Sequence, residues 1–272
     1  MSGTIDRRGL MGAAAAMAAA FALPSAVRAQ SPEGIGGYFE RLRARVQDAG
    51  GGRFLPIAED ALLGEHNQFR ESQGLGRLTR HPSLDEAARA QAADMVERNY
   101  FAHEAPEGFS SVQRVGLFAR RFVGLAGENL VEVTGGPPSS ADELAHLWRG
   151  SPGHRANMLR PRYSHVGFGV ARKGDRTVAA AAFGETYAEL AAPVAFRIDD
   201  LDAVRAALGQ GSSVRGYALA PVGGGRTLGP FWLEDPPPAI EVSGAFSIKP
   251  YLSDHAAAGR FIIVDGPIIE AV

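Results

Sequence analysis

The sequence predicts an α+β fold, because amphipathic helical segments and extended segments occupy separate stretches of the chain. Apolar side chains recur at helical spacing along residues 59–73, 83–99 and 140–150. Further on, residues 166–171 and 177–183 are extended and flank a polar Arg-Lys-Gly-Asp-Arg turn, which is typical of a β-hairpin. These observations predict a layered structure in which helices pack against a sheet.

Helix ends are predicted by local signals. Ser83 and Ser140 are each followed three residues later by a glutamate, the pattern of a capping box, so we predict helix N-termini at these two serines. The helix that follows Ser83 is expected to stop near Asn99, just before His103. A further strand is expected over residues 128–133.

Residues 1–29 have the features of an export signal. An Arg7-Arg8 pair precedes an uncharged, alanine-rich run over residues 10–23, and the Val-Arg-Ala of residues 27–29 predicts cleavage before Gln30. Paired arginines ahead of a weakly hydrophobic run favour a twin-arginine-type signal. We therefore expect a periplasmic or secreted protein with no membrane span after signal cleavage. An uncleaved membrane anchor is the alternative, which the shortness of the run disfavours.

Composition narrows the possible classes of function. The 272-residue chain has no cysteine, which excludes thiol catalysis, disulfides and cysteine-ligated zinc, so any metal must be held by His, Asp or Glu. Its formal charge is −2, and removal of residues 1–29 with three arginines and Asp6 makes it −4. A mildly acidic chain without a long basic run is not expected to bind nucleic acid.

The mature chain divides into three predicted parts. Residues 30–57 resemble a lead-in helix followed by a flexible linker at Gly50-Gly51-Gly52. Residues 58–190 contain the predicted helices and hairpin and form the main domain. Residues 193–272 read as a small β-rich appendage, with one short helix over 199–208 and short strands between Gly and Pro clusters.

Two histidines and one glutamate form the candidate site. His103 follows directly on a helix end, and His154 follows a Ser-Pro-Gly turn, so backbone geometry is expected to pre-position both imidazoles. Glu128 lies between them in the sequence and adds a carboxylate. Two imidazoles and a carboxylate suit an open, zinc-like metal site. A metal-free site in which His and Glu transfer protons is the alternative.

The other chemically capable residues have simpler structural interpretations. We expect Asn129 and Asn157 to tie loops together, and Arg70 to pair with a carboxylate. No serine lies in a Gly-x-Ser-x-Gly turn, which argues against a serine nucleophile. The remaining histidines are expected to be structural or surface groups: His66, His81, His146, His165 and His255.

Several ordered motifs carry a family resemblance. They are His66-Asn67-x-x-Arg70, Phe101-x-His103, Gly127-Glu128-Asn129-Leu130 and Ser151-Pro152-Gly153-His154-Arg155-x-Asn157-Met158-Leu159. Together they resemble the CAP superfamily (cysteine-rich secretory, antigen 5 and pathogenesis-related 1 proteins) in its bacterial, cysteine-free, SCP-like form. The resemblance implies a three-layer α-β-α sandwich over residues 58–190, with a broad cleft.

In that family the cleft is lined by two histidines and two acidic residues. His103, Glu128 and His154 match three of these positions. The fourth departs from the family pattern, because Arg149-Gly150-Ser151 follows Trp148 where relatives have an acidic residue, and Glu143, one turn earlier, is not expected to replace it. Some relatives bind zinc or similar ions, others are associated with sterol or lipid binding, and proteolysis has been proposed for a few. Fold alone therefore does not select a function.

We expect an exported CAP-domain protein that acts as a non-enzymatic binding or interaction module. His103 and His154 are expected to coordinate a divalent, zinc-like metal, and Glu128 to supply a ligand or to orient one. The partner is expected to be an envelope or extracellular ligand, such as a lipid or a cell-wall component. The alternatives are a metal- or Glu/His-dependent hydrolase of peptides or cell-wall material, and a lipid or sterol carrier.

Overall fold

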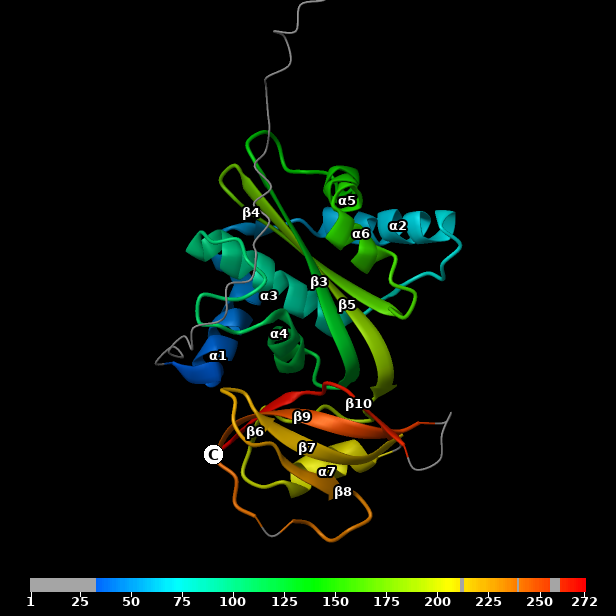
Figure 1. The fold of residues 1–272 in the computed structure, drawn as a ribbon. Helices are drawn as coiled ribbons and strands as arrows, with labels where there is room; N and C mark the ends of the chain where they lie inside the picture. The colour runs from blue at the N-terminus through cyan, green and yellow to red at the C-terminus, as the bar shows by residue number, and fades with distance from the viewer. Residues whose placement is uncertain (1–32, 211–212, 239, 255–259) are drawn as a thin grey trace, which may run out of the picture.

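The computed structural model describes residues 33–210, 213–238, 240–254 and 260–272 (Figure 1). The predicted export signal, its cleavage site and His255 lie outside these residues. Within the described part of the chain, no helix has the length and apolar character that a bilayer span requires. The helices are α1 (Gly34–Asp48), α2 (Pro56–Ser72), α3 (Pro82–Arg98), α4 (Ser111–Phe118), α5 (Ala141–Gly150), α6 (Pro152–Met158) and α7 (Asp202–Gly209).

The first sheet forms the middle layer of a three-layer sandwich. Its strands are β1 (Arg53–Phe54), β2 (Thr79–Arg80), β3 (Phe122–Thr134), β4 (His165–Lys173) and β5 (Arg176–Glu189). The order is β1-β4-β5-β3, with β2 parallel to β4, so β3 is an edge strand. Helices α1, α3 and α4 cover one face and α2, α5 and α6 the other, which confirms the predicted α+β sandwich (Figure 1).

Small residues in the central strands let both helical layers approach closely. In β5, Ala180 and Ala182 pack into the core on the α3 side, whereas Ala179 and Ala181 pack into the core on the α2 side. This alternation is the two-residue period of a strand that is buried on both faces. At Gly167 of β4, an added Cβ would lie 2.1 Å from backbone atoms of α3, so only glycine allows this contact.

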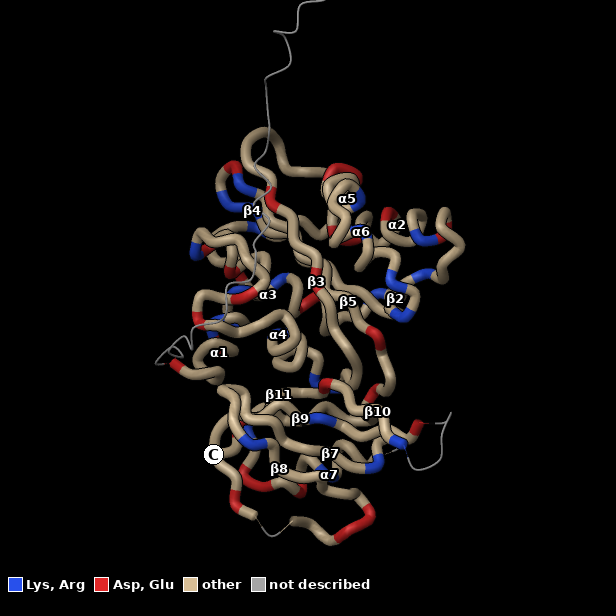
Figure 2. Tube along the Cα trace, viewed as in Figure 1, with Lys and Arg blue, Asp and Glu red and all other residues tan. Residues whose placement is uncertain are grey.

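The C-terminal region forms a second sheet with its own core. Its strands are β6 (Arg197–Ile198), β7 (Val214–Pro221), β8 (Leu228–Trp232), β9 (Gly244–Ser253), β10 (Phe261–Ile263) and β11 (Ile268–Ala271). The order is β6-β11-β9-β7-β8, with β10 on β9, and α7 packs on the sheet through Val204 and Leu208 (Figure 1). The charges of both units are interspersed in sign along the chain (Figure 2).

Two expectations about local structure are wrong, and one helix was not predicted. The chain at Gly50 is not a flexible linker: it forms a 3-10 turn against α3, and α1 is part of the core through the fully buried Tyr38 and Leu42. Helix α3 does not start at a Ser83 cap, because Pro82 occupies its first turn and His81 is the N-cap. Helix α4, capped by Ser110, is absent from the sequence-based assignment.

Candidate functional site

The three predicted site residues come from three elements around the edge strand β3. His103 lies in the loop between α3 and α4, Glu128 lies in β3, and His154 lies in α6. Glu128 faces the α4 side of the sheet, where its carboxylate meets Arg114. His154 belongs to a helix that covers the other face. The free edge of β3 therefore lets groups from both faces of the sheet approach one another.

A buried carboxylate holds the imidazole of His103. The Nδ1 atom of His103 lies 2.8 Å from Oε2 of Glu128, while Arg114 donates from Nη2 to Oε1 of Glu128 at 3.0 Å and to the His103 carbonyl at 2.6 Å. The side chain of Glu128 is 6% exposed and that of Arg114 1%, but that of His103 is 57% exposed. The result is a fixed imidazole whose Nε2 remains available to solvent.

Two asparagines fasten α6, and with it His154, to β3. Asn129 donates from Nδ2 to the His154 carbonyl at 2.9 Å. Asn157 donates from Nδ2 to Oδ1 of Asn129 at 2.9 Å and to the Glu128 carbonyl at 3.2 Å. These contacts match the expected scaffold role of both amides.

The side chain of His154, on α6, is partly buried. Burial, together with the nearby imidazole of His103, lowers the pKa of His154. A lowered pKa favours the neutral imidazole, which is the form that acts as a metal ligand or a general base. The structure therefore brings the three predicted residues into one region, with Glu128 behind His103.

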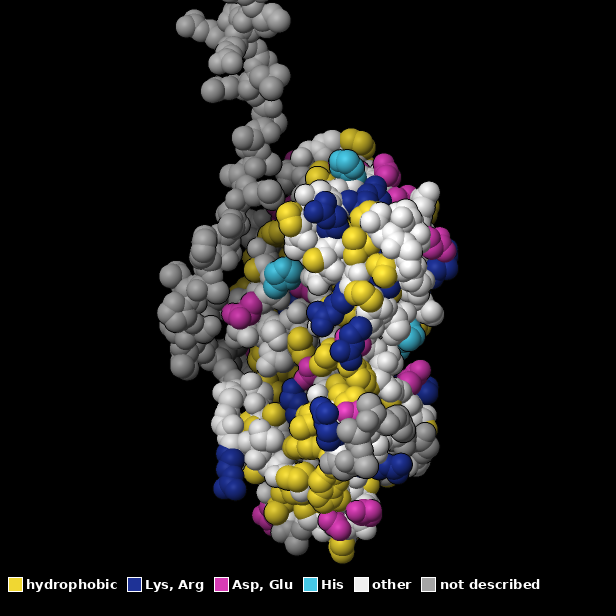
Figure 3. All heavy atoms as spheres, turned by 45° about the vertical axis from the view of Figure 1, so that its right-hand side comes forward, with side chains coloured by type: hydrophobic (Ala, Val, Ile, Leu, Met, Phe, Trp, Pro, Cys, Tyr) yellow, Lys and Arg dark blue, Asp and Glu magenta, His cyan; other side chains and the backbone are white. Residues whose placement is uncertain are grey.

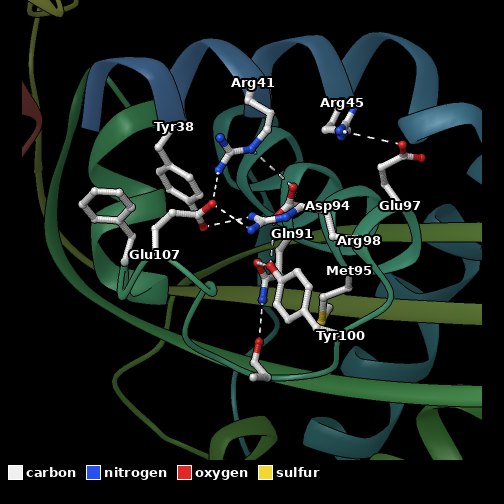
Figure 4. Close-up of polar contacts among 12 residues, drawn as sticks. Tyr38, Arg41, Arg45, Gln91, Asp94, Met95, Glu97, Arg98, Tyr100 and Glu107 are labelled. Atoms are coloured by element: carbon white, nitrogen blue, oxygen red, sulfur yellow. Dashed lines mark hydrogen bonds and ion pairs between the residues drawn. The ribbon is translucent and has the colours of Figure 1, made fainter. Parts of the chain in front are cut away.

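A network of partly buried ions fixes the loop that carries His103 (Figure 4). Glu107, in this loop, binds Arg41 of α1 at 2.7 Å and Arg98 of α3 at 2.8 Å, and these guanidinium groups lower its pKa against the effect of burial. Gln91 of α3 donates to the Ala102 carbonyl at 2.7 Å, next to His103. Helix α1 thus helps to determine where the imidazole lies, which the sequence does not reveal.

The donor set limits the kind of metal site that fits. Both oxygens of Glu128 are already bound, one to His103 and one to Arg114, so this carboxylate orients a ligand rather than facing an ion. Over the described ranges, no group of three His, Asp or Glu side chains is arranged to hold a metal. Of the three predicted ligands, the imidazoles of His103 and His154 therefore remain as candidate donors.

Glu143, the one substitute considered for the fourth acidic position, makes no hydrogen bond or ion pair with His103, Glu128 or His154 among the described residues. Glu143 is exposed in the first turn of α5, where its backbone N–H binds Oγ of Ser140, the predicted N-cap. The buried charged residue beside Glu128 is instead Arg114, which the sequence-based reasoning missed. The signal that could have located it is Ser110-x-x-Gln113, the capping box that opens α4 directly before Arg114.

Two residues of the first sequence motif have structural roles. His66 is fully buried against Trp148 and Phe168, and burial lowers its pKa to about 4. Arg70 was expected to pair with a carboxylate, which is wrong. Its guanidinium binds the backbone carbonyls of Gly76, Met158, Arg160 and Tyr163, and so ties α2 to the segment after α6.

The molecule also has a mainly apolar groove on the α2 side. It measures about 460 Å³ and lies between the start of α2 and the segment before α5. Ile57, at its border, is 85% exposed. In the space-filling view, histidine side chains reach the surface at separate places, among apolar and basic groups (Figure 3).

Comparison with known proteins identifies the first unit. Residues 63–187 match the model of the CAP family, described as the cysteine-rich secretory protein family. Residues 63–187 are a CAP domain. The matched segment runs from α2 to β5, and it includes His103, Glu128 and His154.

The chain is similar to regions of two Bacillus subtilis proteins. It is 34% identical over 108 residues to the uncharacterised protein YkwD, covering 40% of each chain. It is 30% identical over 128 residues to the uncharacterised membrane protein YlbC, covering 47% of this chain and 36% of that one. The chain therefore spans less than half the length of the curated relatives that it matches.

Among solved structures, an outer surface protein of Borrelia burgdorferi matches with a TM-score of 0.44 and 19% identity, covering 50% of this chain and 98% of that one.

Proposed function

We propose that this CAP-domain protein is an exported binding module whose His103 and His154 take up a divalent cation such as Zn²⁺. One observation carries the proposal: Glu128 holds Nδ1 of His103 at 2.8 Å and is itself held by Arg114, while the imidazole remains 57% exposed. A carboxylate that fixes one imidazole nitrogen and leaves the other free is the usual arrangement behind a metal-binding histidine.

The proposed ligand roles follow from the available atoms. His103 presents Nε2, because its Nδ1 faces Glu128, and the lowered pKa of His154 favours its neutral form. A bound cation would supply an electrophilic centre with exchangeable water ligands. Such a centre suits recognition of an anionic or carbonyl-bearing ligand from the cell envelope. Export itself is proposed from the twin-arginine-type pattern of residues 1–29.

Zinc titration of untagged protein against a chromophoric chelator tests the proposal. The His103→Ala/His154→Ala double variant is expected to lose one equivalent of zinc while it keeps its circular dichroism spectrum. His146→Ala, on the exposed side of α5, is the matched control and is expected to bind like the wild type. A double variant with unchanged zinc binding would refute the proposed site.

Hydrolysis is the second candidate, because the Glu128–His103 contact also resembles a carboxylate–imidazole pair for proton transfer. In that case the exposed Nε2 of His103 would act as general base. Digestion screens with peptides and peptidoglycan decide between the two. Turnover that is abolished by His103→Gln in a folded protein would favour the hydrolase.

A carrier of apolar ligands is favoured by a different feature, the groove beside Ile57. Its walls are mostly apolar, which is typical of sites for hydrophobic ligands. Mass spectrometry of lipids that copurify with the protein tests this function. An Ile57→Asp variant should release such lipids without changing zinc uptake.

A further inference from the structure

A second pair of imidazoles lies on the first sheet, separate from the His103 site. His165 begins β4, and His81 is the N-cap of α3, directly after β2. Their ring centroids are 5.7 Å apart and the ring planes are nearly perpendicular, at 86°. Strand β5 separates β4 from β3, so this pair and Glu128 belong to different parts of the sheet.

His81 has a buried nitrogen without a partner. Its Nδ1 atom is inaccessible to solvent and makes no hydrogen bond with any described residue. Buried polar atoms in folded proteins almost always have a partner, because leaving one unpaired is unfavourable. The backbone of His81 is fully used: its N–H binds the Val166 carbonyl, and its carbonyl accepts from Leu84 and Asp85. The unpartnered imidazole nitrogen is therefore a candidate donor to a ligand.

His165 is oriented by two hydroxyl groups. Its Nδ1 atom lies 2.9 Å from Oγ of Ser164 and 2.8 Å from Oγ1 of Thr186. These contacts occupy Nδ1 and leave Nε2 as the free nitrogen, as in metal-binding histidines. Burial and the nearby His81 also lower the pKa of His165, which favours the neutral ring that binds a cation.

The spacing of the two rings suits a shared ion. With metal–nitrogen bonds of about 2.0–2.1 Å in a tetrahedral site, the two ring centroids would be about 5 Å apart. The observed centroid distance of 5.7 Å is close to this value. A carboxylate is also within electrostatic reach, because Glu189, at the end of β5, raises the pKa of His165 against these lowering effects. Its side chain is 53% exposed and pairs loosely with Arg121 at 3.5 Å.

We propose that His81 and His165 form a second site for a first-row divalent cation such as Zn²⁺, and that Glu189 turns toward the pair as the third protein ligand. Rotation of this exposed carboxylate is needed, because the described residues hold no ready-made group of three donors. The site is independent of the one proposed at His103.

Native mass spectrometry of untagged protein titrated with zinc tests the second site. The His81→Gln/His165→Gln variant is expected to bind one zinc ion fewer than the wild type, and the exposed His146→Gln control the same number. The His103→Ala/His154→Ala variant should still bind the ion at His81. If the proposal for His103 and His154 is wrong, the wild type should still bind one zinc ion, and only the His81→Gln/His165→Gln variant should lose it. Equal zinc binding by His81→Gln/His165→Gln and the wild type overturns the proposal.

Two milder variants keep the test valid if the double variant fails to fold. Thr186→Val removes one orienting hydroxyl with little change in shape, and is expected to weaken zinc binding at this site about tenfold. Glu189→Gln is expected to weaken it as well, whereas Arg121→Gln, which frees Glu189, should strengthen it. Unchanged affinity in Thr186→Val contradicts the orientation of His165, and unchanged affinity in Glu189→Gln contradicts the role of the carboxylate.

Discussion

The imidazole of His103 and the carboxylate of Glu128 meet at 2.8 Å, although 25 residues separate them in the chain. Arg114 holds the second oxygen of this carboxylate from inside the core, so the pair is anchored on one side and open on the other. The contact explains why an exposed histidine in a loop has a defined orientation.

Replacement of Glu128 by glutamine should weaken zinc binding at His103 about 10- to 100-fold, the usual effect of removing an orienting carboxylate. Arg114 and His103 contact different oxygens of the Glu128 carboxylate, and a glutamine side chain has only one oxygen that can accept a hydrogen bond. The free energy of unfolding is therefore expected to fall by about 1–3 kcal/mol. Competition titration and urea unfolding measure the two effects.

Glu132→Gln is the matched control, because Glu132 lies in the same strand and pairs with Arg176 near the surface. It should leave zinc affinity unchanged. If Glu128→Gln behaves like Glu132→Gln, Glu128 does not orient the site.

The buried His66 predicts a pH dependence of stability. Its pKa falls from 6.5 in the unfolded chain to about 4 in the folded protein, because burial disfavours the charged ring. The unfolded state therefore binds more protons than the folded state between these two pH values. The stabilisation that His66 contributes to the folded state is complete above pH 6.5 and is lost as the pH falls toward 4. At pH 5 the free energy of unfolding is therefore expected to be about 2 kcal/mol lower than at pH 7.5 because of this histidine.

Urea unfolding of the wild type and of His66→Gln at the two pH values checks this prediction. The difference in unfolding free energy between the two pH values should be about 2 kcal/mol smaller in His66→Gln than in the wild type. The exposed His146→Gln variant should show the same difference as the wild type. An equal difference in His66→Gln and the wild type would assign the acid sensitivity to other groups.

Arg120 should be essential for the contact between the two sheets. Its guanidinium is largely buried, binds the carbonyls of Gly116, Val194, Ala195 and Ile268, and has its pKa lowered to about 10 by burial. Arg120→Met leaves these carbonyls without their donor. We expect a loss of about 2–4 kcal/mol in unfolding free energy, measured by urea denaturation.

Arg77 provides the comparison for Arg120, because it forms an exposed pair with Glu71. Arg77→Met should change stability by less than about 1 kcal/mol. Similar losses in the two variants would mean that Arg120 contributes no more than a surface arginine.

The helices and the hairpin could be predicted because their apolar period is local. The signal at Ser83 was misread since Pro82, which lacks an N–H and has a fixed φ, begins the helix one residue earlier. Helix α4 was missed because it has only eight residues, too few for a clear period.

The candidate site was predictable only in part. The histidines and Glu128 lie in recognisable motifs, but the partner of Glu128 is a matter of tertiary packing. Arg114 reaches Tyr38 across 76 residues of sequence, and Glu107 bridges α1 and α3. No local pattern encodes such pairings. The same holds for His81 and His165, which come together only when β2 aligns with β4.

Nitrogen-15 NMR of the histidine side chains during zinc addition tests the central claim most directly, since it reports each imidazole nitrogen separately. The resonances of Nε2 of His103 and of one ring nitrogen of His154 are expected to shift on zinc binding, while Nδ1 of His103 stays protonated against Glu128. Resonances of His103 and His154 that remain unmoved at saturating zinc would contradict that claim.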